Sequence, residues 1–329
     1  MKPDHTKQAS LLAVENLIVE FGIGRGTKIH AVSDVSFNID SGETLGLVGE
    51  SGCGKSTLAR AIVQLQKPTS GKIWFDGYDM TDGNNSRLRE LRPRLQMIFQ
   101  DAAASLHPAR RVGRTISEPL RAVGESDRRN RRRKARALMQ QVGLDPDQIY
   151  DRRPFEISIG QCQRISIARA LITNPKLLVC DEPVSSLDVS VQAQILNLLE
   201  RIKAHHELTM LFISHDLAVV KNICDRVAVM YMGKLCEIAD SESLYQRPRH
   251  PYTAVLLASI PEISASRDQR EIELRGVEIP SPAAPPSGCR FRTRCPHAQQ
   301  RCEDEEPVLE GSDTGSRVAC HYPLGKNTK

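Results

Sequence analysis

The chain has 329 residues, of which 40% are hydrophobic and 26% are charged, as in a soluble globular protein with one substantial domain and an appendage, or two modest domains. The formal net charge of +5 is too small to indicate nucleic-acid binding by itself. Its first ten residues lack the apolar stretch of a secretory signal, and no apolar run is long enough to span a bilayer, so we expect a cytosolic protein with reduced thiols.

Two stretches near the N-terminus alternate polar and apolar residues. They are LAVENLIVEF (12–21) and AVSDVSFNI (31–39), and they predict antiparallel strands with one buried face. A near-continuous apolar run, TLGLVG (44–49), predicts a buried strand that leads into a glycine-rich turn and a helix. Two further buried strands are predicted at 177–182 and 209–215, each after a helical pattern. Such βαβ units indicate an α/β fold with a mostly parallel sheet.

The middle of the chain is charged and helical in pattern from about residue 105 to 155. With the helix that follows, it predicts an inserted helical subdomain over about 105–170. Its run DRRNRRRKARAL (127–138) has two interpretations, a nucleic-acid contact or the solvated face of a surface helix. We favour the solvated face, because no aromatic side chains interleave with the arginines. A proline-rich stretch, IPSPAAPPSG (279–288), predicts an extended linker before the C-terminal region.

Residues 49–56, GESGCGKS, match the pattern G-x-x-x-x-G-K-[ST] between a predicted strand and a predicted helix. Glycines let the backbone wrap until its N–H groups point at phosphate oxygens, and the start of the helix adds partial positive charge. Lys55 can reach the β- and γ-phosphates of a nucleotide, and the Ser56 hydroxyl can ligate Mg²⁺. A chance glycine-rich turn is the alternative, and the two correct flanking elements argue against it.

Two other predicted strands end in polar side chains. LLVCDE ends in Asp181 and Glu182, and TMLFISH leads to His215. The carboxyl ends of parallel strands share one edge of a sheet, where ligands bind. One acid there can hold Mg²⁺, a second can polarise an attacking water, and the histidine can contact the γ-phosphate. Taken singly, each would more often be a loop residue or a helix cap.

The turn ISIGQ (157–161) precedes an amphipathic helical pattern. Ser158 and Gln161 have the S-x-x-Q spacing of a capping box. The first-turn amides of the predicted helix also point outward as an anion site. Because the chain already has a phosphate loop, a second such site suggests a nucleotide shared between two subunits.

In their order and spacing, these motifs resemble those of an ABC transporter ATPase over roughly residues 12–240. The resemblance identifies 49–56 as the Walker A loop, 157–161 as the signature turn, and 177–181 with Glu182 as Walker B. It also identifies Ser186-Leu187-Asp188 as the D-loop. The fold it implies is a mixed sheet with a P-loop core, an antiparallel β subdomain and an inserted helical subdomain.

The resemblance implies a chemistry as well. Water would attack the γ-phosphate of ATP in line with Glu182 as base, and His215 and the Q-loop glutamine Gln100 would complete the catalytic set. Mg²⁺ would be held by Ser56, Gln100 and Asp181. The residues implied to bind the nucleotide are Phe21 (for adenine stacking), Gly49, Glu50, Ser51, Gly52, Cys53, Gly54, Lys55, Ser56, Thr57, Gln100, Asp181, Ser158, Gly160, Gln161 and Asp188.

The C-terminal part narrows the resemblance. RPRHPYTAVLLASIP (247–261), then GCRFRTRCP and two more cysteines, resembles the C-terminal extension of dipeptide and oligopeptide (and nickel) importer ATPases, and most of all their F-type subunits. We therefore predict an ABC nucleotide-binding domain at 1–240, a linker with the HPY segment at 241–288, and a small four-cysteine region at 289–329.

Such importers imply particular partners. They are a second ABC ATPase subunit in a head-to-tail dimer, two transmembrane permease subunits and, indirectly, an extracytoplasmic solute-binding protein. The chain would then be peripheral on the cytoplasmic face of the inner membrane, with Gln100 coupling ATP to the permeases, and no nucleic acid would be bound. The competing functions are a soluble ABC ATPase acting on nucleic acid, an importer ATPase for nickel or another solute, and an inactive regulatory subunit.

One residue departs from the family pattern. The usual signature is Leu-Ser-Gly-Gly-Gln, and Ile159 replaces its first glycine. If Ser158 is the N-cap, Ile159 is the first helical residue and needs no positive φ, so we expect crowding by its side chain rather than backbone strain. We expect the ATP site that this signature completes to close less well, which favours a hetero-dimer.

Nine cysteines need an explanation other than disulfides. Five of them lie among apolar neighbours and are predicted to be buried: Cys53, Cys162, Cys180, Cys224 and Cys236. The other four are spaced C-x5-C-x6-C-x17-C: Cys289, Cys295, Cys302 and Cys320. Four thiolates can hold a [4Fe–4S] cluster or Zn²⁺, and the importer resemblance favours the cluster. Unligated thiols are the remaining alternative.

Overall fold

The computed structural model describes residues 10–24, 26–260, 274–276, 278–311 and 316–325. The chain divides into two compact units. The first consists of Met1–Asp40, Thr44–Asp82 and Ser214–Lys329, and the second of Ser41–Glu43 and Gly83–Ile213. Each unit is described by itself below.

The first unit contains an antiparallel sheet with strand order β2-β1-β4-β5. Its strands are β1 (Leu12–Gly22), β2 (Lys28–Ile39), β4 (Ser70–Phe75) and β5 (Tyr78–Asp79). On β1 the residues Leu12, Val14, Leu17 and Val19 are buried. The alternation in the sequence therefore follows one covered face of the sheet, as predicted.

A second group of strands in this unit has the order β11-β12-β10-β9-β3. They are β3 (Thr44–Val48), β9 (Arg226–Tyr231), β10 (Lys234–Asp240), β11 (Glu310–Gly311) and β12 (Arg317–Val318). β3 and β9 run parallel, whereas the other pairs are antiparallel. The helices of the unit are α1 (Lys55–Ile62), α8 (Leu217–Ile223), α9 (Ser241–Gln246), α10 (Pro251–Ala258) and α12 (Gln300–Asp304).

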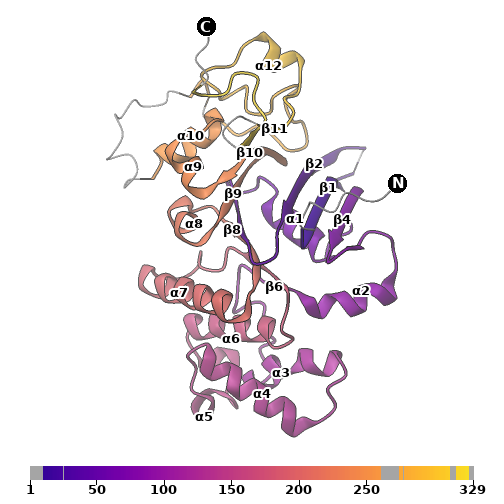
Figure 1. Ribbon diagram of the computed structural model, residues 1–329, viewed down its shortest axis with the longest axis vertical. Coiled ribbons are helices and arrows are strands. Elements are labelled where there is room, and N and C mark those ends of the chain that lie inside the picture. The colour runs from indigo at the N-terminus through magenta and orange to yellow at the C-terminus, as the bar shows by residue number, and fades with distance from the viewer. Residues whose placement is uncertain (1–9, 25, 261–273, 277, 312–315, 326–329) are drawn as a thin grey trace, which may run out of the picture. The chain divides into compact units, whose positions relative to one another are not determined.

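The second unit has a parallel sheet of order β8-β7-β6, formed by β6 (Leu95–Ile98), β7 (Leu177–Asp181) and β8 (Thr209–Ser214). Its helices are α2 (Asn85–Leu91), η1 (Arg92–Arg94), α3 (Val112–Ala122), α4 (Arg128–Gln141), α5 (Pro146–Ile149), η2 (Pro154–Glu156), α6 (Ile159–Leu171) and α7 (Val189–His206). Between residues 112 and 171 the elements are helices only, and α3, α4, α5 and α6 gather together (Figure 1). The predicted α/β class, with a mixed sheet and inserted helices, is confirmed.

The described part of the stretch predicted as a linker, 241–288, contains α9 and α10. The carboxylate of Glu237 on β10 accepts hydrogen bonds from the backbone N–H groups of Arg249 (2.8 Å) and His250 (2.9 Å). His250 then caps α10 through its Nδ1, which accepts from the N–H of Tyr252 at 3.0 Å. The HPY segment is thus fixed to β10 by hydrogen bonds that the buried carboxylate of Glu237 accepts. The domain bounds drawn from the sequence remain predictions.

No helix in the ranges that the structure describes is long and apolar enough to cross a membrane. The five cysteines predicted to be buried, Cys53, Cys162, Cys180, Cys224 and Cys236, are all buried and free. Burial raises the pKa of the Cys53 and Cys180 thiols, which keeps them protonated at neutral pH.

Candidate active site

The loop of residues 49–56 joins β3 to α1 in the first unit. Gly49 and Gly54 have φ of 153° and 109°, and a Cβ at either would lie 2.1 Å from a backbone oxygen, that of Met230 or Ala31. Both positions therefore require glycine on conformational and steric grounds. This requirement explains why the sequence pattern has glycine at positions 49 and 54.

Lys55 is the first residue of α1 and is only 4% exposed. Its ammonium donates hydrogen bonds to the carbonyl oxygens of Gly49 (2.7 Å) and Glu50 (2.9 Å). The positive charge is therefore held against the loop backbone. Ser56 and Thr57 follow in the first turn of the helix, where the helix dipole favours an anion.

Two other predicted site residues lie in the first unit. Phe21 is half-buried near the end of β1 and pairs with Ile29 of β2. His215 is exposed directly after β8. The next residue, Asp216, caps α8 and accepts hydrogen bonds from the N–H groups of Ala218 and Val219.

In the second unit the structure brings Gln100 and Glu182 together. Glu182 directly follows β7, and Gln100 follows the neighbouring parallel strand β6. The Gln100 Nε2 donates a hydrogen bond to the Glu182 Oε2 at 3.0 Å. Asp181, the last residue of β7, is 1% exposed. Asp181 and Glu182 thus lie at the predicted strand end, and Gln100, which only the family resemblance had identified, lies beside them at the same sheet edge.

Glu182 has an unusual backbone. Its φ of 47° lies in the left-handed region, which a non-glycine residue rarely adopts. The conformation is held by a hydrogen bond from its N–H to the carbonyl of Ile213, at 3.0 Å. Strain of this kind gathers at functional sites, and the sequence held no signal of it.

The signature turn forms the predicted capping box. The Ser158 Oγ accepts from the N–H of Gln161 (3.2 Å), and the Gln161 Oε1 accepts from the N–H of Ser158 (3.0 Å). Ile159 is the first residue of α6, does not have a positive φ, and is 57% exposed. Both predictions, the box and a relaxed backbone at Ile159, are confirmed.

Gly160 lies against α7, the helix that follows the D-loop. A Cβ on Gly160 would lie 3.0 Å from Val191 of α7, so the glycine lets the two helices approach closely. Asp188 caps α7, and its Oδ1 accepts from the Val191 N–H (2.9 Å) and from the Ser190 hydroxyl (2.6 Å). These hydrogen bonds lower the pKa of Asp188, and the bond from the Ser190 hydroxyl has the largest effect. The signature glycine thus packs against the first turn of α7, which the D-loop residue Asp188 caps.

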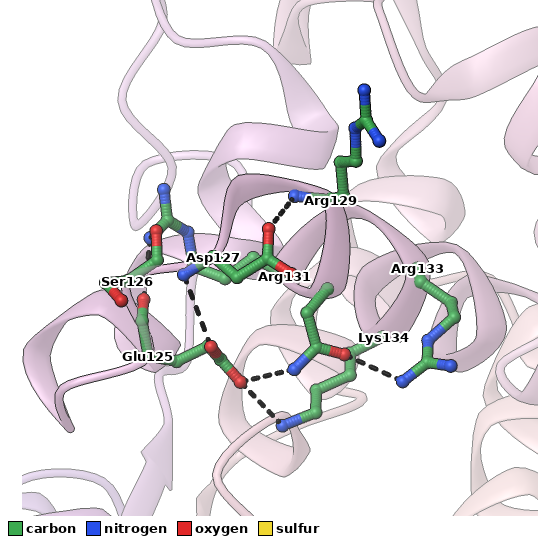
Figure 2. Close-up of polar contacts among 8 residues, drawn as sticks. Glu125, Ser126, Asp127, Arg129, Arg131, Arg133 and Lys134 are labelled. Carbon is green, nitrogen blue, oxygen red and sulfur yellow. Dashed lines mark hydrogen bonds and ion pairs between the residues drawn. The ribbon is translucent and has the colours of Figure 1, made fainter.

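The arginine run begins α4 and is mostly exposed. Arg129 and Arg133 are exposed, and Arg133 donates to Asn130 (Figure 2). Arg128 and Arg132 are exposed too, and together with the half-buried Arg131 they line a cavity of about 780 Å³ beside α3. The run therefore lies on an exposed face of α4, part of which borders this cavity.

This arginine cavity is defined by its lining residues: His107, Ala109, Arg110, Arg111, Arg114, Ser117, Glu118, Arg121, Arg128, Arg131, Arg132, Tyr150 and Asp151. Two guanidinium–carboxylate pairs lie within it, Arg111 with Asp151 (2.9 Å) and Arg114 with Glu118 (3.8 Å). With seven arginines and two acids, the lining has a net charge of +5 (7 − 2).

The four C-terminal cysteines line one small cavity. Cys295 and Cys302 are each 7% exposed, and Cys289 and Cys320 are half-buried. Burial raises the pKa of Cys289 to about 11 and that of Cys320 to about 12. Among the described residues, however, no three His, Cys, Asp or Glu side chains have the arrangement of a metal-ion site. The four predicted ligands thus line one cavity, but their side chains are not arranged as a metal-coordination site.

Two contacts of the phosphate loop were missed by sequence reasoning. Glu50 pairs with Arg294, and its N–H donates to the hydroxyl of Tyr252. The partners are 244 and 202 residues away, so no local pattern could have revealed them.

Comparisons with known proteins identify the family. The model of the family described as ABC transporter matches residues 32–185, and that described as "Oligopeptide/dipeptide transporter, C-terminal region" matches residues 236–302. The oligopeptide transport ATP-binding protein OppF of Salmonella typhimurium is 48% identical over 312 residues, which cover 92% of this chain and 93% of the relative. The Bacillus subtilis protein AppF, also an oligopeptide transport ATP-binding protein, is 48% identical over 296 residues, 89% of each chain.

Among solved structures, the dimeric post-hydrolysis state of the ATP-binding cassette MJ0796, bound to ADP and Pi, matches with a TM-score of 0.64 and 27% identity, covering 70% of this chain and 98% of that one. The cbiO1 structure from Clostridium perfringens, part of the ABC transporter complex cbiONQ, matches with a TM-score of 0.63 and 27% identity over 78% of this chain and 98% of that one. The chain therefore belongs to the ABC transporter family, among the ATP-binding subunits of its oligopeptide and dipeptide branch.

Proposed function

We propose that the chain is the ATP-hydrolysing subunit that powers import of dipeptides or oligopeptides across the cytoplasmic membrane. The observation that carries this is the presence, in one chain, of the ABC transporter region (32–185) and the oligopeptide transporter C-terminal region (236–302). The curated relatives favour peptide import over the nucleic-acid and nickel alternatives. Deleting the gene and measuring uptake of labelled oligopeptides tests the proposal: uptake should fall to background, and unchanged uptake would contradict it.

In the proposed reaction, Lys55 and the loop amides bind the phosphates of ATP while Phe21 stacks on the adenine. The Glu182 carboxylate takes the proton from the attacking water, and Gln100 and His215 orient the water and the γ-phosphate. The hydrogen bond between Gln100 and Glu182 supports this, because it fixes the base at the strand edge.

Mg²⁺ is the expected cofactor of this reaction. Ser56, Asp181 and Gln100 carry the oxygen donors that it prefers, and we assign it to them. When bound, the ion neutralises charge that develops on the phosphate oxygens.

We further propose that the signature (157–161) and the D-loop (186–188) face the ATP of a second ATPase subunit. Three large apolar side chains in or beside these motifs are exposed, Phe155 (71%), Ile159 (57%) and Val189 (82%). Large apolar side chains left exposed at both motifs fit an interaction surface. A partner subunit of different sequence would avoid carrying the Ile159 substitution in both sites, so we propose a hetero-dimer.

Replacing Ile159 with Gly tests the role of this side chain. If its bulk limits closure, ATP hydrolysis by the whole transporter should rise roughly two- to tenfold, because overpacking costs about 1–3 kcal/mol and part of this would be relieved in the barrier. Ile159→Ala is the matched variant, since it removes the bulk while keeping a better helix former. If neither variant hydrolyses ATP faster than the unmodified chain, Ile159 does not limit closure.

We place the contact with the permease subunits on the arginine cavity of the second unit. Arg110, Arg121 and Arg128 line it without an ion pair or side-chain hydrogen bond to any residue in the described ranges. The charge of the lining fits an acidic segment exposed on the cytoplasmic side of a permease. Through such a contact, together with Gln100, ATP hydrolysis would be coupled to the permeases and, beyond the membrane, to a solute-binding protein. The chain would then lie on the cytoplasmic face of the inner membrane.

For the four C-terminal cysteines we propose a [4Fe–4S] cluster, with Zn²⁺ as the alternative. The supporting observation is that all four thiols line the same cavity, whose donor set suits either group. When bound, the group would cross-link a region with little apolar core of its own. No redox chemistry is assigned to it.

Anaerobic purification followed by iron, sulfide and zinc analysis tests the cluster. We expect about four iron and four sulfide per chain, and a large loss of both in Cys295→Ser. Cys224→Ala, a buried cysteine outside the cavity, is the matched control and should retain them. About one zinc without iron would favour the alternative, and a colourless protein free of both metals would contradict the two metal proposals together.

A further inference from the structure

The Walker A loop is held by the C-terminal region through an ion pair. The Arg294 Nη1 lies 2.8 Å from the Glu50 Oε2, and its Nη2 lies 3.0 Å from the Glu50 Oε1. The two parallel hydrogen bonds match the planar guanidinium to the carboxylate, which is the strongest geometry for such a pair. The Arg294 side chain is 7% exposed and that of Glu50 24%. This is a covered contact, and it is worth more than an ion pair at the surface.

The same loop residue is held a second time through its backbone. The N–H of Glu50 donates to the Tyr252 hydroxyl at 3.0 Å. Tyr252 belongs to the HPY segment, is fully buried, and packs against Tyr231 and Phe291 with ring centroids 4.7 Å and 5.2 Å away. The guanidinium of Arg294 lies over the rings of Tyr231 and Phe291, 5.8 Å and 5.9 Å from their centroids. One aromatic cluster therefore supports both contacts with Glu50.

Glu50 is in turn bonded to the lysine that meets the phosphates. Its carbonyl oxygen accepts a hydrogen bond from the Lys55 ammonium at 2.9 Å. Arg294 fixes the side chain of Glu50, Tyr252 fixes its N–H, and its carbonyl then holds Lys55. Arg294 also offsets the negative charge that Glu50 brings to a loop that binds anions.

The phosphate-loop pattern specifies nothing at position 50, so its general mechanism does not explain these contacts. Arg294 is next to Cys295, one of the four cysteines around the C-terminal cavity. A direct chain of contacts thus leads from the cysteine region to the ATP-binding loop.

We propose that Arg294 is a positioning residue for ATP, and that through Glu50 the C-terminal region sets the affinity of the Walker A loop for the nucleotide. The inference builds on the proposed ATPase function, but it concerns binding and is tested separately from transport. The C-terminal region then acts as a part of the nucleotide site rather than as a separate appendage.

The test compares the full chain with Arg294→Ala and Arg294→Lys in equilibrium ATP binding and in hydrolysis by the assembled transporter. We expect the Kd and the KM for ATP to rise about tenfold or more in Arg294→Ala, the loss that a charge-assisted pair worth about 1.5–3 kcal/mol gives. The kcat should change less than about threefold, because Glu182 is untouched. Arg294→Lys should give intermediate Kd and KM values, since lysine keeps the positive charge but cannot form the two parallel hydrogen bonds of a guanidinium.

Arg292→Ala is the matched control. Arg292 lies two residues away, and among the described residues its side chain bonds to Ser287 and Glu303, not to the phosphate loop. It should lower thermal stability without raising the Kd for ATP. Glu50→Gln is a second route to the same contact that keeps side-chain shape, and combining it with Arg294→Ala should add little to either single change.

The outcomes separate the two proposals. If Arg294→Ala and Glu50→Gln fold and bind ATP as tightly as the unmodified chain, or if Arg292→Ala weakens binding equally, the positioning role is wrong. If the unmodified chain binds ATP but supports no peptide uptake, the proposed function fails, while the comparison of Kd values still decides the role of Arg294.

Discussion

Replacing Glu182 with Gln is expected to lower ATP hydrolysis by about 100- to 10,000-fold, the contribution of a well-placed general base. The amide keeps the size of the carboxylate, and its oxygen can still accept the hydrogen bond from the Gln100 Nε2. The strand edge should therefore keep its shape while the group that takes the proton from water is lost. Phosphate release by the assembled transporter measures the rate, and equilibrium ATP binding should stay within about threefold.

The chain provides a close control for this change. Glu207 is another glutamate with a left-handed backbone, φ 49°, at the end of α7 and outside the site. Glu207→Gln repeats the same chemical change on the same unusual backbone, and it should leave hydrolysis unchanged. A Glu182→Gln transporter that keeps more than a third of its rate would contradict the assignment of Glu182 as base.

Reversing three charges of the arginine cavity is expected to abolish assembly with the permeases. In the combined variant of Arg110, Arg121 and Arg128 to Glu, the lining changes from +5 to −1 (5 − 6), so an acidic permease segment would be repelled. Like charges brought together at an interface cost several kcal/mol, which corresponds to at least about a hundredfold weaker association. Co-purification of the subunit with its permeases at low and at physiological salt measures the loss.

The control carries the same total charge change outside the cavity. Arg129, Arg133 and Arg201 are exposed residues of the second unit that do not line it. Their combined change to Glu should leave assembly intact, and a Glu-to-Lys change on the permease should restore binding of the cavity variant. Assembly of the cavity variant at all salt concentrations would refute the placement. Loss of binding to anionic lipid vesicles with assembly intact would refute it too, by showing that the arginines contact lipid headgroups.

The parts of the molecule that the sequence predicted are those whose cause is local. Gly49 and Gly54 are needed because a Cβ would collide with backbone, and the Ser158–Gln161 box closes within four residues. Asp181 and Glu182 were predicted at the end of a buried strand, and they lie at the carboxyl end of β7. In each case short-range geometry decides the residue type, so a pattern in one sequence is enough.

The parts that it did not predict depend on contacts between distant segments. Arg294 reads as one of several basic residues in a cysteine-bearing tail until it is seen beside Glu50. Arg128, Arg131 and Arg132 continue the spacing of the buried positions Ala135, Leu138 and Met139, but a charged run at the start of a helix gave no reason to expect a cavity. The α3 residues on the other side of that cavity are brought there by the packing of the helices, which the sequence pattern does not specify.

The central claim is that ATP hydrolysis by this chain drives peptides through a membrane. The most direct measurement is uptake of labelled dipeptides and longer oligopeptides by vesicles that contain the whole transporter, with ATP on the side of this subunit. We predict uptake that requires ATP and disappears with Glu182→Gln. Uptake that proceeds without ATP or survives Glu182→Gln, or its absence for every peptide while ATP is hydrolysed, would contradict the account.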